Sequence, residues 1–170
     1  MEQLLEEQVG ELLRQRGLKL VLAESCTGGR VSDRITNVPG SSDYYLGGIT
    51  AYAYEVKEQL LGVSPQTLAE FGAVSRECVQ EMARGARMAL AIEFPLERLV
   101  SVSISGIAGP GGGTLEKPVG LVWIGLSAAD GAWAWRFQFD GDRIQVKEQS
   151  AQEALRCLND YLRGQISAKE

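Results

Sequence analysis

The stretch Leu18-Lys-Leu-Val-Leu-Ala-Glu-Ser-Cys-Thr-Gly-Gly29 decides the fold, because its character changes halfway along. Its first six residues are mostly apolar, which predicts a largely buried strand over 18–23. The next six are small or polar and end in two glycines, which predicts a tight turn into a helix. A helix begins with main-chain N–H groups that lack an intrahelical partner and carry partial positive charge. The turn is therefore a place where a side chain and main-chain donors meet.

Ser25 lies in this turn, at the mouth of the predicted helix. An acyl-transfer site requires a hydroxyl that attacks and donors for the oxyanion that forms, and Thr27, Gly28 and Gly29 are expected to present those donors. The same pattern also fits a serine or threonine that only caps the helix, or a turn that binds phosphate. Cys26 is expected to be a buried, inert thiol. The residues alone leave these interpretations open.

The sequence contains no histidine. A Ser-His-Asp triad, a Cys-His dyad and a histidine-ligated zinc site are therefore excluded within this chain. A serine nucleophile would need lysine, a carboxylate, tyrosine or water as its base. Lys57 is the candidate base, with Tyr52 to orient the pair or relay the proton, and Glu24 is a rival base or a partner for departing ammonia. The competing interpretation of Lys57 is a solvated surface lysine.

The rest of the chain alternates between helical periodicity and short runs rich in Val and Ile. Ser75 and Asp142 are expected to cap helices. Interleaved strands and helices, with one hairpin turning at 128–131, predict a single three-layer α/β/α domain with a mixed, mostly parallel sheet. This domain is expected to span 1–164, followed by a disordered tail at 165–170. The expected helices are 3–16, 30–37, 55–61, 67–71, 76–92 and 142–162. Strands are expected at 18–23, within 44–53, and at 99–105, 119–127 and 132–139.

A glycine-rich segment, Gly106-Ile-Ala-Gly-Pro-Gly-Gly-Gly-Thr114, follows the strand expected at 99–105. It lacks both the Gly-Lys-Ser/Thr of a P-loop and the dinucleotide fingerprint, so it predicts neither ATP nor NAD binding. Its glycines let the main chain approach a ligand closely, which suits a flap for a phosphate or carboxamide. The alternative interpretation of this segment is a long connection without a function. The alternative interpretation of Arg143 is a surface arginine that binds no ligand. The candidate substrate-binding residues are Glu24, Gly106, Gly109, Gly111, Gly112, Thr114, Lys117 and Arg143.

Composition limits the class of protein. The 170 residues are 45% hydrophobic and 23% charged, which is typical of one soluble globular domain. The net charge of −5 argues against a nucleic-acid partner, and no apolar run approaches the ~20 residues that span a bilayer. The acidic amino terminus is not expected to act as a secretory signal, and three cysteines without C-x-x-C spacing suit reduced thiols in a cytoplasm. Trp123, Trp133 and Trp135 are expected to serve packing or an oligomer face.

Nine short blocks of the sequence, taken in order, resemble the carboxy-terminal domain family of the competence protein CinA. They cover nearly all of the chain outside its last few residues. The blocks are Ala23-Glu-Ser-Cys-Thr-Gly-Gly29, Pro39-Gly-Ser-Ser42, Ala51-Tyr52 with Lys57, Leu61-Gly-Val63, Gly72-Ala-Val-Ser75, Met82-Ala83, Gly106-Ile-Ala-Gly-Pro110, Lys117-Pro-Val-Gly120 and Gly141-Asp-Arg143.

The stand-alone members of that family are nicotinamide-nucleotide amidases. The resemblance implies hydrolysis of nicotinamide mononucleotide to nicotinate mononucleotide and ammonia, no metal or cofactor, and a homo-oligomer of two or more subunits. It implies that Ser25 attacks the carboxamide carbon, that Lys57 and Tyr52 assist proton transfer, and that the glycine loop, Lys117 and Arg143 hold the nucleotide. Activities of the amino-terminal domain of longer CinA proteins are not expected here.

One departure from the family pattern bears on activity. Many relatives have Ser-Asn after the Ala-Tyr or Thr-Tyr pair, whereas this sequence has Ala53-Tyr54. The alternative function is therefore a catalytically weak module of the same fold, which binds a pyridine nucleotide or acts as a competence-related interaction partner.

Overall fold

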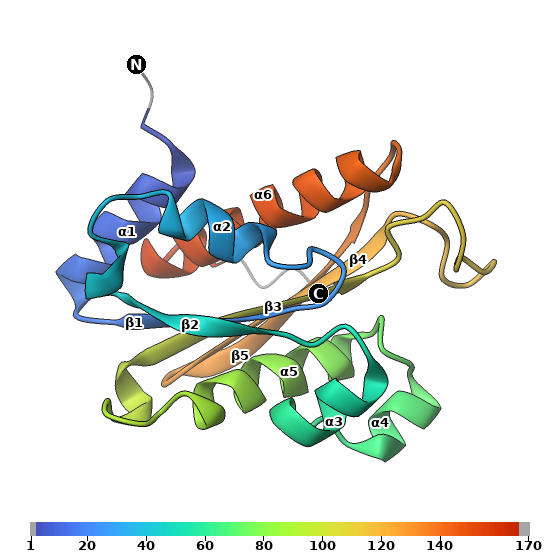
Figure 1. The fold of residues 1–170 in the computed structure, drawn as a ribbon, viewed down its shortest axis with the longest axis horizontal. Helices are drawn as coiled ribbons and strands as arrows, with labels where there is room; N and C mark the ends of the chain where they lie inside the picture. Colours follow the sequence, from blue (N-terminus) through green and yellow to red (C-terminus); the bar gives the residue numbers. More distant parts are fainter. Residues whose placement is uncertain (1–2, 167–170) are drawn as a thin grey trace.

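A five-stranded mixed sheet forms the centre of the molecule (Figure 1). The computed structural model describes residues 3–166. The strands are β1 (Lys19–Glu24), β2 (Tyr45–Thr50), β3 (Leu99–Gly106), β4 (Leu121–Ala128) and β5 (Gly131–Gln138). They lie in the order β2-β1-β3-β4-β5. β1 is parallel to both β2 and β3, whereas β4 is antiparallel to both β3 and β5, so only β4 runs against the other strands.

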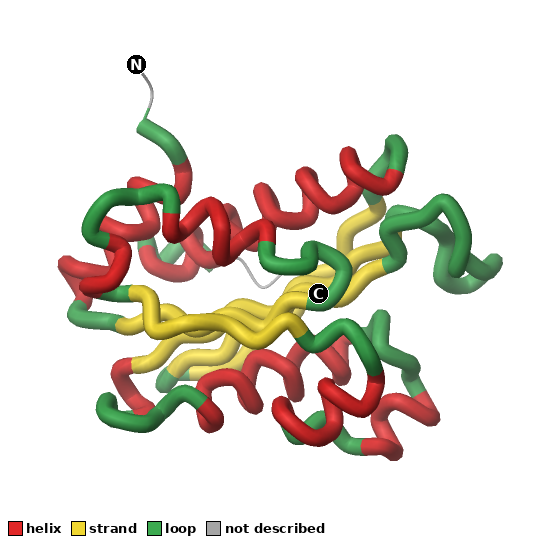
Figure 2. The backbone as a smooth tube through the Cα atoms, in the orientation of Figure 1, coloured by secondary structure: helices red, strands yellow, loops and turns green. Residues whose placement is uncertain are grey.

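Helices cover both faces of this sheet (Figures 1 and 2). One face carries α1 (Leu5–Arg16), α2 (Arg30–Thr36) and α6 (Arg143–Leu162), and the other carries α3 (Tyr54–Leu61), α4 (Pro65–Glu70) and α5 (Arg76–Ala89). Two short 3₁₀ turns, η1 (Ser41–Asp43) and η2 (Leu96–Arg98), lie between these elements. A separate apolar cluster fills the space on each face. The predicted three-layer α/β/α fold with a mixed sheet is therefore confirmed.

The predicted helix caps are present. The Ser75 hydroxyl accepts the Cys78 N–H at 3.2 Å, and the Asp142 carboxylate accepts the Gln145 N–H at 2.9 Å. One boundary differs from the prediction: the helix expected at 67–71 begins at Pro65, with Ser64 as its cap. Proline is tolerated there because the first helical N–H has no intrahelical acceptor.

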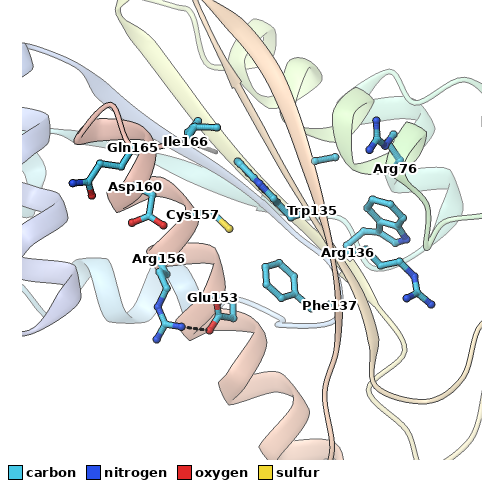
Figure 3. A pocket seen from close by; sticks show the side chains of 12 residues that line it. Arg76, Trp135, Arg136, Phe137, Glu153, Arg156, Cys157, Asp160, Gln165 and Ile166 are labelled. Atoms are coloured by element: carbon cyan, nitrogen blue, oxygen red, sulfur yellow. Dashed lines mark hydrogen bonds and ion pairs between the residues drawn. The ribbon is translucent and has the colours of Figure 1, made fainter. Parts of the chain in front are cut away.

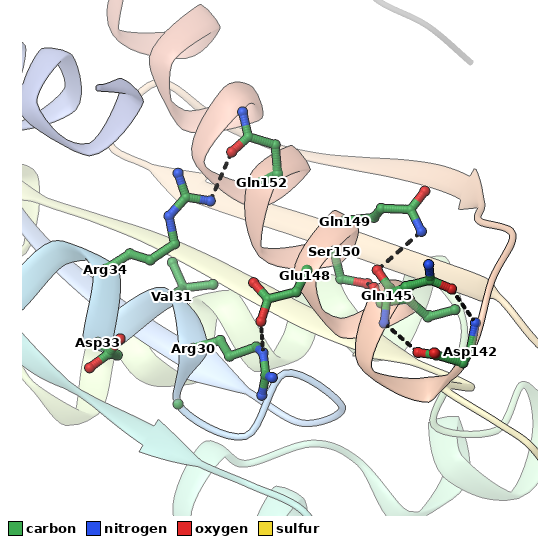
Figure 4. A network of polar contacts seen from close by, with 12 residues as sticks. Arg30, Val31, Asp33, Arg34, Asp142, Gln145, Glu148, Gln149, Ser150 and Gln152 are labelled. Atoms are coloured by element: carbon green, nitrogen blue, oxygen red, sulfur yellow. Dashed lines mark hydrogen bonds and ion pairs between the residues drawn. The ribbon is translucent and has the colours of Figure 1, made fainter. Parts of the chain in front are cut away.

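A polar network ties α2 to α6 (Figure 4). Arg30 Nε lies 2.7 Å from Glu148 Oε1, and Arg34 Nη1 donates to Gln152 Oε1 at 2.8 Å. Arg34 also forms an ion pair of 2.6 Å with Glu6 of α1. These contacts fix α2, and with it the turn that precedes it, against the first half of α6.

The expected domain end at residue 164 stays a prediction. The Gln165 N–H donates to Asp160 O at 2.8 Å, and Ile166 packs against the apolar cluster under α6, so these two residues lie against the domain. The rest of the expected disordered tail, 167–170, lies outside the described residues. No helix within residues 3–166 has the length and apolar character that crossing a membrane requires.

Helix α5 packs tightly against the end of α3, the helix that carries Lys57. A Cβ atom added at Gly85 would lie 1.8 Å from the carbonyl oxygen of Leu61, the last residue of α3. The two helices therefore approach at a point where only glycine fits.

We predict that Gly85→Ala lowers the free energy of unfolding by about 1–3 kcal/mol, the usual cost of overpacking. Helix propensity alone predicts a gain of roughly 0.5–1 kcal/mol from the same change, so the sign is informative. Urea unfolding measures it, with Gly111→Ala as the control because a Cβ there meets no atom within 4 Å. A stabilised Gly85→Ala variant would contradict the packing.

Candidate active site

A pocket of about 290 Å³ opens where the three parallel strands end. Such carboxyl ends are the usual ligand site of open α/β sheets. The turn after β1, the connection after β2 and the glycine loop after β3 meet there with the start of α6. Its lining residues are Ser25, Cys26, Tyr52, Tyr54, Lys57, Ala73, Val74, Ser105, Gly106, Ile107, Ala108, Gly109, Gly111, Gly112 and Arg143.

Lys57 and Ser25 contact each other at the base of this pocket. Lys57 Nζ lies 3.0 Å from Ser25 Oγ, and it also donates to the carbonyl oxygens of Ala51 at 2.7 Å and Tyr52 at 3.3 Å. Lys57 is only 1% exposed, so the alternative of a solvated surface lysine is wrong. The structure brings together the two residues on which the predicted chemistry depends.

The surroundings of Lys57 favour its neutral form. Burial lowers the pKa of Lys57, an effect only partly opposed by the nearby Cys78 and Cys26 thiols. Lys57 is the fourth residue of α3, and the positive end of a helix dipole also disfavours a cation there. A neutral amine has two hydrogens for the two carbonyl oxygens and one lone pair for the Ser25 hydroxyl. The geometry therefore lets Lys57 accept the Ser25 proton without moving.

The turn holds fewer free main-chain donors than the sequence predicts. The Gly28 N–H donates to Ser25 O at 3.1 Å, and the Gly29 N–H donates to Glu24 Oε2 at 3.0 Å. The prediction of these two glycines as oxyanion donors is therefore wrong. Within residues 3–166, the N–H groups of Cys26 and Thr27 have no acceptor, and the buried Thr27 hydroxyl is also unpaired. Cys26 and Thr27 are thus the donors nearest to Ser25 in the chain.

Glu24 has a structural role. Its buried carboxylate accepts the N–H groups of Gly29, Val31 and Ser32 and the Ser32 hydroxyl, at 2.8–3.2 Å. Glu24 does not line the pocket, so the structure contradicts its predicted roles as rival base and substrate contact. The carboxylate instead satisfies the free donors at the start of α2.

The Arg143 side chain bridges the mouth of the pocket. Its Nη1 donates to Gly109 O at 2.7 Å and its Nη2 to the Tyr52 hydroxyl at 2.9 Å. The glycine loop, the β2–α3 connection and α6 are joined in this way. The Tyr52 hydroxyl therefore contacts Arg143, and only the main-chain carbonyl of Tyr52 reaches Lys57.

The glycine loop divides into a part that lines the pocket and a part that does not. The four predicted glycines of the loop all line it, whereas Thr114 and Lys117 do not. Lys117 Nζ donates to Phe71 O, and the Thr114 hydroxyl accepts the Lys117 N–H at 3.0 Å. The predicted ligand contacts of Thr114 and Lys117 therefore stay predictions, and in this structure both residues close the base of the loop.

Two polar residues near the site escaped the sequence prediction. Ser105 lines the pocket and is 2% exposed. Ser101 and Ser103, on the same face of β3, donate to carbonyl oxygens of α5, and the sequence alternation does not distinguish Ser105 from these two serines. Lys147 Nζ lies 3.6 Å from where a Cβ on Gly28 would be. Its spacing of four residues from Arg143 on one helix was the available signal.

Burial raises the pKa of the Cys26 thiol to about 12, as expected for an inert cysteine. The buried, unpaired state of Cys26 among the described residues agrees with that prediction. Residues 3–166 hold no group of three or more His, Cys, Asp or Glu side chains arranged for a metal ion.

Comparison with known proteins defines the family of this chain. The family model described as the CinA C-terminal domain matches residues 2–162, and the chain belongs to that family. A putative competence-damage inducible protein of Moorella thermoacetica is 48% identical over 161 residues, covering 95% of this chain and 37% of the relative. The CinA-like protein of Desulfotalea psychrophila is 46% identical over 154 residues, 91% of this chain and 36% of that protein. The chain thus spans a little over a third of these curated relatives.

Solved structures share the fold as well. The competence damage-inducible protein A of Klebsiella pneumoniae superimposes with a TM-score of 0.86 at 32% identity, covering 94% of this chain and 95% of that chain. A competence/damage inducible protein of Agrobacterium tumefaciens gives a TM-score of 0.83 at 34% identity, with 96% and 99% of the two chains covered.

We predict that Lys57 makes folding stability depend on pH. Between its lowered pKa and the ordinary value of 10.5, the unfolded chain binds a proton that the folded chain does not. Below the pKa of Lys57 in the folded chain, the buried amine is charged and lowers the free energy of unfolding by the full cost of its burial. This destabilisation disappears as the pH rises towards 10.5. The melting temperature of the wild type should rise relative to Lys57→Met across that window. Parallel curves would contradict this, and Lys147→Met, which removes a partly exposed amine, is the control.

Proposed function

We propose that this chain is a serine-dependent amidase that hydrolyses the carboxamide of nicotinamide mononucleotide to nicotinate mononucleotide and ammonia. The observation that carries the proposal is the 3.0 Å contact between Ser25 Oγ and the buried amine of Lys57. The nucleotide substrate is proposed from the family resemblance, and the lone Ser-Lys pair in a pocket with main-chain donors supports the amide chemistry.

In the first half of the reaction, Ser25 Oγ attacks the carboxamide carbon while Lys57 Nζ takes the hydroxyl proton. The carbonyl oxygen becomes an oxyanion that accepts a hydrogen bond from the N–H group of Cys26, which lines the pocket beside Ser25. The C–N bond then breaks, and the Lys57 ammonium returns the proton to the departing nitrogen, which leaves as ammonia. An ester between Ser25 and the nicotinate carbonyl remains.

In the second half, a water molecule attacks that ester, and Lys57 accepts its proton. The C–O bond to Ser25 breaks, and the proton passes back to Ser25 Oγ as the carboxylic acid departs and ionises. Ser25 Oγ and Lys57 Nζ take part in both halves of the reaction. The carbonyl oxygens of Ala51 and Tyr52 hold Lys57 Nζ in place throughout.

We assign binding of the nucleotide phosphate to Arg143 and the glycine loop. Arg143 is the arginine that lines the pocket, and its guanidinium reaches across the mouth to Gly109 and Tyr52. A guanidinium offers several donors in one plane, which suits phosphate oxygens.

A second candidate function is nucleotide binding with little turnover, in a competence-related interaction module. The observation that favours it is Tyr54, which lines the pocket and is 50% exposed where the resemblance implies an asparagine. Under this alternative, nucleotide raises the melting temperature, but no ammonia is released at any protein concentration.

We predict that Ser25→Ala abolishes ammonia release from nicotinamide mononucleotide and that Lys57→Met slows it by about 10²–10⁴-fold, the usual contribution of a general base. Wild-type activity should fall at low pH as Lys57 becomes protonated. Cys26→Ala is the matched control, because it changes the neighbouring residue without removing either partner. Equal rates in wild type and Ser25→Ala would reject the mechanism, and nucleotide-induced stabilisation without ammonia would favour the binding module.

We further predict that Arg143→Ala raises KM for the nucleotide by roughly tenfold or more, because it removes a cation that lines the pocket, at about 1.5–3 kcal/mol per charged hydrogen bond. Lys117→Ala should have a smaller effect, since its amine is bonded to Phe71 O outside the pocket. Steady-state kinetics with both variants test this assignment. A larger KM effect for Lys117→Ala would reverse it.

A further inference from the structure

Within residues 3–166, strand β5 pairs with β4 alone, so it is an edge of the sheet, and its outer side is regular. The Phe139 N–H donates to Gly120 O at 2.9 Å, and the Ile107 N–H to Leu121 O at 2.9 Å. Together with the registers of β3–β4 and β4–β5, these bonds show that the odd-numbered residues of β5 direct their main-chain N–H and C=O groups towards β4. The even-numbered residues therefore direct their N–H and C=O groups away from the sheet. They are Ala132, Ala134, Arg136 and Gln138.

The composition of β5 does not protect this edge. The strand contains no proline or lysine and one charged residue, and its pairing with β4 has no register shift. Proteins that leave an edge strand free usually interrupt it with charges, proline or bulges. Trp133, Trp135 and Phe137 alternate along one face of β5 and are only partly buried. This edge therefore has the character of a strand that pairs.

A groove lined by residues of β5 and α6 lies along this edge (Figure 3). Its volume is about 430 Å³, compared with about 290 Å³ for the pocket at Ser25. On one side it is bounded by Trp135, Phe137 and the α6 residues Glu153, Arg156 and Asp160. Both signs of charge occur along α6, so the surface can complement an identical surface turned by 180°. The groove shares no lining residue with the pocket at Ser25.

We propose that β5 pairs in antiparallel fashion with β5 of a second copy of this chain, about a two-fold axis at Trp135. In this register Ala134 hydrogen-bonds with the second copy's Arg136, and Ala132 with the second copy's Gln138. Trp135 faces its own equivalent, and Trp133 faces the second copy's Phe137. These are the closely spaced, non-hydrogen-bonded positions, where aromatic pairs interact well.

Charge disfavours one of the two neighbouring registers. Moving the axis by one residue to Arg136 would place two arginines directly opposite each other, which is destabilising. With the axis at Trp135, each Arg136 faces an alanine, and strand residues 132–138 are all paired. The result is a ten-stranded sheet through two copies, with a Ser25 pocket in each.

Sedimentation of the full chain tests the proposal with two variants at one position. Arg136→Pro removes an outward N–H, which an edge strand tolerates, whereas Arg136→Ala removes the same side chain and keeps the N–H. Wild type and Arg136→Ala should sediment at twice the monomer mass, and Arg136→Pro at the monomer mass. A monomeric wild type, or equal masses for the two variants, would overturn the proposal.

Hydrogen exchange of the wild type gives an independent test that needs no folded variant. Amides of the four outward residues should be protected at high concentration and should lose protection on dilution, while Trp133, Trp135 and Phe137 amides stay protected by β4. Protection of the outward amides that does not change with dilution, or their fast exchange in a dimer, would rule out pairing through β5. Sedimentation and hydrogen exchange do not depend on ammonia release, so they test the pairing of β5 independently of the proposed function.

Discussion

The buried amine of Lys57 is the contact on which the site depends. Removing a lysine amine from water costs free energy, and two carbonyl oxygens without a carboxylate compensate only part of that cost. The fold nevertheless holds it firmly: the Ala51 N–H donates to Glu24 O at 2.8 Å, so the ends of β1 and β2 are joined, and α3 begins directly afterwards. Selection for folding stability alone would not favour a lysine here, yet the Lys57 amine is held 3.0 Å from Ser25 Oγ. The arrangement is understandable as a means of keeping an amine neutral beside a hydroxyl.

Neighbouring residues in the turn have different hydrogen-bonding roles. Glu24 takes the donors at the start of α2, and Gly28 closes the turn onto the carbonyl of Ser25. Among the described residues of this turn, the Cys26 and Thr27 N–H groups then remain without an acceptor. A carboxylate so close to an oxyanion would oppose it, but here the charge is spread over the helix donors that it accepts. The same carboxylate therefore fixes the position of the turn and determines which donors are left for a ligand.

The sequence predicts local features well and long-range partners poorly. The strand before Ser25, the caps at Ser75 and Asp142 and the α/β/α layering follow from periodicity and local hydrogen bonding, which act over a few residues. The pairing of Lys57 with Ser25 was predicted as chemistry, but its burial depends on α3 packing against α5. The contact of Lys117 with Phe71 O does not follow from the sequence, because that acceptor lies 46 residues earlier in the chain. Lys147 was missed because only the packing of α6 over the turn brings it near Gly28.

The two edges of the sheet differ: the β2 edge leads to the candidate active site, whereas the β5 edge is the one proposed to pair with a second copy. The β2 edge carries Gly47 at φ 145° and a register shift opposite Leu20 and Val21, and such irregularities discourage pairing with another strand. It also leads directly into the connection that carries Tyr52 and Lys57. The β5 edge is regular and aromatic, and β3 and β4 separate it from β1 and its Ser25 turn. A second copy paired at β5 therefore contacts the sheet where no pocket residue lies, whereas one paired at β2 would press on the connection that positions the base.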